Sequence, residues 1–66
     1  MDTLPQKNSE LAVLIDEYIH SERDRRIMRL RLIDGHTYER IAEIVEMSPR
    51  QIREIVKKLK KRLENA

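Results

Sequence analysis

Helix breakers are scarce in this chain, which has one glycine and two prolines in 66 residues. Between them, apolar residues recur at intervals of three and four, the spacing of an amphipathic helix with one buried face. The pattern predicts an all-α fold of four helices, near residues 9–20, 22–34, 37–45 and 48–64. Residues 1–8 lack this periodicity, so we expect a flexible leader there and a single helical domain over residues 9–66.

Short side chains with an oxygen acceptor stand at the expected helix starts, where they can accept hydrogen bonds from the free N–H groups of a first turn. They are Asn8 or Ser9, Ser21, Thr37 and Ser48. Pro49 follows the last of these at the first helical position, where its missing N–H costs nothing. Gly35 is expected to end the second helix in the left-handed conformation. The apolar stripe of the first helix is expected to comprise Leu11, Leu14, Ile15, Tyr18 and Ile19.

The side chains that catalysis or metal binding would need are sparse. The chain has no cysteine, which excludes disulfides and thiolate metal sites and fits a cytoplasmic location. No apolar run approaches the roughly 18 residues of a membrane span, and the N-terminus has no signal-peptide pattern. His20 and His36 have no second histidine at helical spacing, and three serines stand at expected helix caps. We therefore expect no enzyme, no metal or other cofactor, no membrane contact and no small-molecule substrate.

The charge is unevenly divided along the chain. Residues 1–20 have a net charge of −3 and residues 21–47 are balanced. Residues 48–66 hold seven basic and two acidic residues, for a net charge of +5. A basic segment of this kind indicates a polyanionic partner such as nucleic acid. The simpler interpretation is a solvated helix end, because cations also suit the C-terminal end of a helix dipole.

Residues 37–59 are expected to form a helix-turn-helix, since two short helices are joined there by about three residues. Ala42 is small where the first helix must let the second approach closely. Glu46 stands where the turn usually has glycine, and a left-handed Glu46 would cost about 1 kcal/mol relative to glycine. The alternative is a plain αα-hairpin, but bundle hairpins seldom combine a short turn, a small residue and a basic outward face.

Four segments carry a family pattern: DRRIMRLRL at 24–32, DGHTYERIA at 34–42, SPRQIREI at 48–55 and KKLKKRL at 57–63. They resemble the fourth region of bacterial sigma factors and, more loosely, the DNA-binding domains of the LuxR type. The resemblance covers about residues 9–63 and implies a domain that reads the promoter −35 element and docks on the flap of RNA polymerase. Because the preceding sigma regions are absent, we expect a free-standing module of the kind found among phage and mobile-element regulators.

By this resemblance the base-reading positions fall at Pro49, Arg50, Arg53 and Glu54. The side-chain chemistry is suitable, because each arginine can donate two hydrogen bonds to guanine and a glutamate can accept one from cytosine. Gln51 is added because its amide can pair with adenine. Two positions depart from the family pattern, since sigma factors commonly have arginine at the position of Pro49 and glutamine at that of Glu54.

Contacts to DNA phosphates are expected from hydroxyls and N–H groups at helix starts and from basic side chains. The candidates are Thr37, Tyr38, Arg40, Ser48, Lys57, Lys58 and Lys61. Tyr38 has two open interpretations, because its hydroxyl can reach a phosphate while its ring can equally belong to the core.

The sequence therefore predicts a sequence-specific DNA-binding transcription regulator whose recognition helix, residues 48–59, enters a major groove of double-stranded DNA. One protomer offers few base contacts, so we expect a homodimer formed through the first helix or through the end of the last helix around Leu59 and Leu63. One alternative is a protein-interaction module that binds RNA polymerase or a sigma factor through residues such as Arg26 and Arg29. Another is an accessory of phage DNA packaging or recombination.

Overall fold

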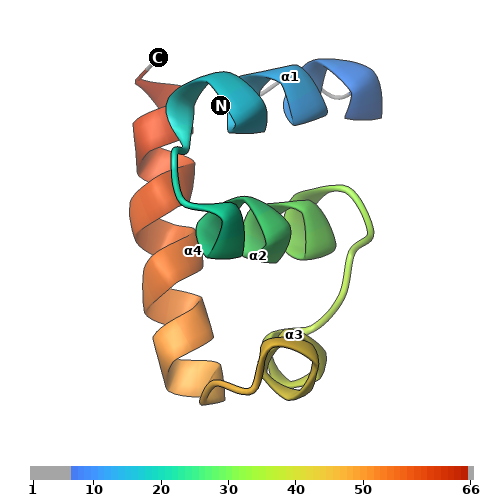
Figure 1. Cartoon of the computed structure of the whole chain (residues 1–66), viewed down its shortest axis with the longest axis vertical. Helices are drawn as coiled ribbons and strands as arrows, with labels where there is room; N and C mark the ends of the chain where they lie inside the picture. Colours follow the sequence, from blue (N-terminus) through green and yellow to red (C-terminus); the bar gives the residue numbers. More distant parts are fainter. Residues whose placement is uncertain (1–6, 66) are drawn as a thin grey trace.

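The longest helix runs the height of the molecule, and three shorter helices pack along it (Figure 1). The structure is a computed structural model that describes residues 7–65. Its helices are α1 (Asn8–Tyr18), α2 (Glu22–Leu32), α3 (Tyr38–Val45) and α4 (Pro49–Glu64), and residues 7–65 contain no strand. The predicted all-α fold of four helices is confirmed. Of the expected leader, residues 1–6 lie outside the described residues, and the division between leader and domain stays a prediction.

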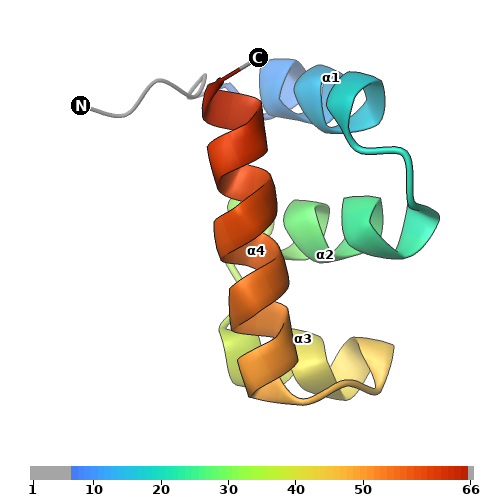
Figure 2. The same ribbon diagram turned by 90° about the vertical axis from the view of Figure 1, so that its left-hand side faces the viewer.

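The three shorter helices pack against different parts of α4. α1 lies beside the C-terminal end of α4, α2 beside its middle and α3 beside its start, and each of the three contacts α4 (Figure 1). The second view shows the α3–α4 turn at the end of the molecule that lies farthest from α1 (Figure 2). The helix-turn-helix therefore occupies one end of the domain, supported by α2, while α1 closes the other end of the core.

The core is built from the apolar stripes that the sequence predicts. Its buried members are Leu11, Ile15, Ile19, Ile27, Met28, Ile41, Ala42, Ile52, Val56, Leu59 and Leu63. Tyr18, the last residue of α1, was expected on the first stripe, but it is 40% exposed. The proposal of a dimer surface around Leu59 and Leu63 is also corrected, since both are at most 4% exposed within one protomer. α1 packs against this half of α4 and removes those side chains from solvent (Figure 1).

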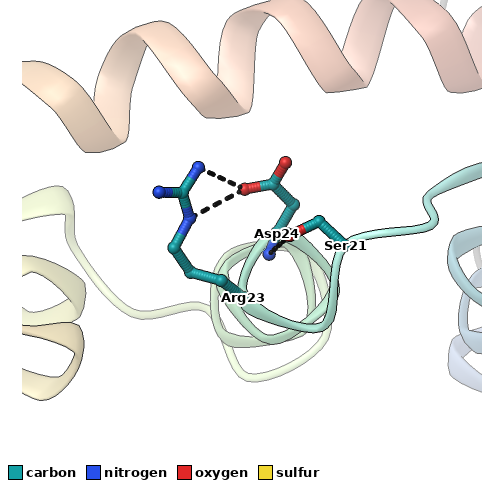
Figure 3. A network of polar contacts seen from close by, with 3 residues as sticks. All are labelled: Ser21, Arg23 and Asp24. Atoms are coloured by element: carbon teal, nitrogen blue, oxygen red, sulfur yellow. Dashed lines mark hydrogen bonds and ion pairs between the residues drawn. The ribbon is translucent and has the colours of Figure 1, made fainter.

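Local hydrogen bonds explain where α2 begins and ends. The Ser21 hydroxyl accepts a bond from the Asp24 N–H at 3.4 Å, as expected of a cap. The Asp24 carboxylate does not complete a capping box but accepts two bonds from the Arg23 guanidinium, at 3.1 and 3.2 Å, and both side chains project on the side where α4 passes (Figure 3). Gly35 has φ of +74°, as predicted, and beyond it the His36 N–H donates to the Leu30 carbonyl at 3.0 Å.

α1 is held mainly from its C-terminal end. Its N-cap is Lys7, with no side-chain cap, so the expected capping by Asn8 or Ser9 is wrong. Two arginines of α2 hold the other end. Arg25 donates to the Ile19 carbonyl and, at 2.9 Å, to the Asp16 carbonyl, while Arg29 forms an ion pair with the Asp16 carboxylate. Cations there satisfy the free carbonyls of the last turn and complement the helix dipole.

Candidate nucleic-acid interface

The turn between α3 and α4 consists of three residues, Glu46, Met47 and Ser48. Glu46 is left-handed, with φ 58° and ψ 47°, as anticipated for the position that glycine usually holds. The reversal lets the Met47 N–H donate to the Ala42 carbonyl at 2.9 Å, and this carbonyl also accepts from the Glu46 N–H, so two bonds close the end of α3. Ala42 is 5% exposed, in agreement with a small residue at the crossing of the two helices. The expected helix-turn-helix geometry is confirmed.

The first turn of α4 is fixed by a complete capping box. The Ser48 hydroxyl accepts from the Gln51 N–H at 3.2 Å, and the Gln51 side-chain oxygen accepts from the Ser48 N–H at 3.1 Å. Pro49 occupies the first helical position, as predicted. The capping role of Gln51 was missed by the sequence analysis, although a serine followed three residues later by glutamine is its signal. Base reading by Gln51 stays a prediction, and its side-chain oxygen is engaged in the cap.

All five predicted base-reading residues are exposed on the first two turns of α4. Ile52 and Val56, on the opposite face, are buried in the core. Arg50 and Glu54 form an ion pair one turn apart at 3.9 Å, with side chains 90% and 73% exposed. Such an exposed pair is worth at most about 0.5 kcal/mol. Either side chain can therefore exchange this contact for one with a ligand at little cost.

Arg53 lies beside an aromatic ring that belongs to α3. Its guanidinium carbon is 5.9 Å from the centroid of the Tyr38 ring, and that of Arg31 is 4.3 Å from the same centroid. Tyr38 is half-buried and packs against the core, which agrees with the core interpretation of its ring. A phosphate contact by its hydroxyl stays a prediction. Arg31 was missed as a site residue, because no local pattern brings α2 to this ring.

The predicted phosphate-binding residues fall into two groups. Thr37 caps α3 by accepting from the Arg40 N–H at 3.1 Å, and the Arg40 guanidinium pairs with Glu43 at 3.2 Å. Both residues are exposed at the start of α3, where free N–H groups favour an anion. Ser48 caps α4 in the same way.

The three lysines of the predicted phosphate set lie farther along α4. Lys57, Lys58 and Lys61 are exposed, and their helical spacing continues the face of Arg50 and Arg53. At a rise of about 1.5 Å per residue, Lys61 lies about 20 Å along the helix from Ser48. The basic face therefore runs along most of α4 and is not confined to the turn between α3 and α4.

Two open grooves flank α2. One lies on the α1 side and is lined by Asp16, Glu22, Arg25, Arg26, Arg29, Leu30 and Asp34. The other reaches α3 and is lined by Glu22, Arg23, Arg26, Ile44, Val45 and Glu46. Arg26 is exposed and lines both grooves, whereas Arg29 is paired with Asp16.

The fold and this exposed helix face define a helix-turn-helix domain of the DNA-binding class. Residues 21–63, which are more than half of the chain, match the family model of sigma-70, region 4, and the chain belongs to this family. The membership supports a DNA-binding regulatory role. No curated protein matches the chain, and no solved structure does.

Residues 7–65 contain no group of three histidine, cysteine, aspartate or glutamate side chains arranged to hold a metal ion. Over the same range, every helix is too short or too polar to cross a bilayer.

Proposed function

We propose that this chain is a sequence-specific DNA-binding transcription regulator, not an enzyme, that inserts the start of α4 into a major groove. The observation that carries the proposal is the exposed face of the first two turns of α4, with Arg50 and Arg53 on a helix whose other face is buried. The capping box at Ser48 and Gln51 holds this helix end in one conformation. A rigid, exposed, arginine-bearing helix end is what base reading in a major groove requires.

In this mechanism the two kinds of contact have separate tasks. The starts of α3 and α4 and the lysines of α4 bind phosphates and set the register on the duplex. Arg50 and Arg53 then donate to guanine edges, and each good contact contributes about 1–3 kcal/mol of discrimination between base pairs. Glu54, released from Arg50, accepts from cytosine.

The test is selection of bound duplexes from a random pool, followed by anisotropy titrations of the enriched sequence. We expect a defined motif whose binding weakens about 5- to 150-fold in Arg50→Ala or Arg53→Ala, from the loss of one base contact. Arg62→Ala is the matched control, because Arg62 is also an exposed arginine of α4 but lies in its last turn. Failure to enrich any motif, with only weak binding that salt abolishes, would contradict specific reading.

We further propose that the regulator binds as a homodimer to two half-sites about one DNA turn apart. With Leu59 and Leu63 buried in the protomer, α1 is the remaining candidate surface. It exposes the apolar side chains Val13 and Tyr18, which are 56% and 40% exposed. The spacing of half-sites in the selected motif, together with the mass of the complex in sedimentation, tests this arrangement.

A second candidate function is contact with RNA polymerase or a sigma factor. The observation that favours it is the groove on the α1 side of α2, in which Arg26 is exposed. Arg26→Ala should then reduce capture of polymerase while leaving DNA affinity unchanged. Arg53→Ala should have the opposite pattern, so the two variants separate the candidates.

A further inference from the structure

Two arginines from different helices lie over the ring of Tyr38, which belongs to a third helix. Arg31 comes from α2, Tyr38 begins α3 and Arg53 belongs to the second turn of α4. The guanidinium carbons lie over the ring, 4.3 Å from its centroid for Arg31 and 5.9 Å for Arg53. Both distances are within the range of a cation–π interaction, in which the electron-rich ring face attracts a positive charge.

The two arginines differ in how firmly they are held. Arg31 is half-buried, and its guanidinium also donates to the His36 carbonyl at 2.9 Å. This bond and the closer ring contact fix Arg31 against Tyr38. Arg53 is exposed, and among residues 7–65 its guanidinium forms no hydrogen bond or ion pair, which leaves the ring of Tyr38 as its electrostatic partner. Arg31 of α2 therefore holds the ring of Tyr38 in place, and Arg53 contacts a ring whose position is fixed.

The two arginines of this cluster lack an acidic partner within the described part of the chain. Across the described residues, neither Arg31 nor Arg53 has a carboxylate within ion-pair distance, whereas Arg23, Arg29, Arg40 and Arg50 each do. Two guanidinium groups without an internal counter-ion raise the local positive potential. That arrangement favours an anionic partner at the point where α3 and α4 are both exposed.

We infer that Tyr38 is a positioning residue, whose ring orders Arg53 before DNA arrives and thereby sharpens discrimination at the base pair that Arg53 reads. The inference rests on the proposed function. A free arginine side chain samples many rotamers, and ordering it in advance lowers the entropy lost on contact. The effect falls on the specific complex, because a contact with the general phosphate backbone tolerates several arginine conformations.

Two substitutions separate the ring of Tyr38 from its hydroxyl. Tyr38→Phe keeps the ring and removes the hydroxyl, so discrimination should be preserved while any phosphate contact is lost. Tyr38→Leu keeps an apolar side chain for the core but removes the ring. Discrimination at the Arg53 base pair should then fall about two- to fivefold, the strength of an exposed cation–π contact. Tyr38→Phe is therefore the matched control for Tyr38→Leu, because the two variants differ in the presence of the ring and both lack the hydroxyl.

The first measurement is made on the free protein by NMR. The side-chain protons of Arg53 should be shifted by the ring current of Tyr38 in the wild-type protein and in Tyr38→Phe, and this shift should vanish in Tyr38→Leu. Thermal unfolding followed by circular dichroism sets a temperature at which all variants are folded. An Arg53 with no ring-current shift in the wild-type protein overturns the inference without reference to DNA.

The second measurement is discrimination in anisotropy titrations. The base pair read by Arg53 is first identified as the position at which Arg53→Ala loses its preference. Tyr38→Leu should lower the preference at that pair alone, and adding it to Arg53→Ala should change nothing further. Full discrimination in Tyr38→Leu overturns the positioning role and leaves the proposed function standing. Absence of any sequence preference in the wild-type protein overturns both.

Discussion

The left-handed residue in the α3–α4 turn predicts that Glu46→Gly stabilises the protein. Glu46 has φ 58° and ψ 47°, a conformation that costs an L-residue about 1–2 kcal/mol. Glycine avoids this cost but loses about 0.5–1 kcal/mol through the greater freedom of its unfolded chain. Removing a carboxylate from the C-terminal end of α3 contributes about 0.3 kcal/mol more. The net expectation is about 1 kcal/mol of added stability, which corresponds to about 4–8 °C in the midpoint of thermal unfolding.

The assay is urea and thermal unfolding followed by circular dichroism, with Glu46→Ala as the matched control. Alanine removes the same charge but keeps the left-handed strain, so its stability should stay within about 0.5 kcal/mol of the wild type, as for other exposed positions. Glu46 is exposed and has no ion-pair partner among residues 7–65, so neither variant loses an ion pair. Equal stability of the glycine and alanine variants would refute the argument that the turn is strained at this residue.

Gly35 gives the converse test: an added Cβ would meet nothing within 4 Å, so Gly35→Ala should destabilise the protein through its φ of +74° alone, by about 1 kcal/mol in urea unfolding. An unchanged midpoint would mean that this loop relaxes at no cost. Ser48→Ala should cost about 1 kcal/mol by removing the cap of α4, whereas Ser9→Ala should cost almost nothing because Ser9 caps no helix. Equal effects of the two serine substitutions would exclude the capping explanation. If about four phosphates are neutralised per protomer, the logarithm of DNA affinity should fall with the logarithm of salt concentration with a slope of about −3.6, and Lys57→Ala should reduce its magnitude by about 0.9. Titrations at several salt concentrations measure both slopes, and an unchanged slope in the variant would remove Lys57 from the phosphate contacts.

Much of the fold follows from signals that lie within a few residues of one another. The start of α4 is encoded by Ser48 and Pro49, because capping bonds act over a single turn. Gly35 is left-handed as predicted, but α2 ends earlier than expected, at Leu32, with Ile33 as its C-cap. The helical periodicity also identified the buried residues Leu11, Ile15 and Ile19 of the first stripe. The base-reading positions on α4 came instead from the resemblance to the sigma family, and Gln51 was added from its side-chain chemistry.

The errors came where a helix ends or where two helices meet. The predicted stripe of α1 ran to Ile19, which is buried, but it also included Tyr18, whose side chain is 40% exposed. Leu59 and Leu63 were considered for a dimer surface, because the sequence does not show that α1 packs on the C-terminal half of α4. An apolar stripe indicates that one face of a helix is buried, but it does not indicate which other helix packs against that face.

The sequence by itself therefore determines four helices, the N-caps of α2, α3 and α4, the sharp turn and a basic exposed face on the last helix. The meeting of Arg31 and Arg53 at the ring of Tyr38 depends on how α2, α3 and α4 cross. These residues stand 7 and 15 positions from Tyr38, beyond the reach of any single helical turn. Their contact comes from packing between helices, which is set by the shape of the whole core and not by local backbone preference.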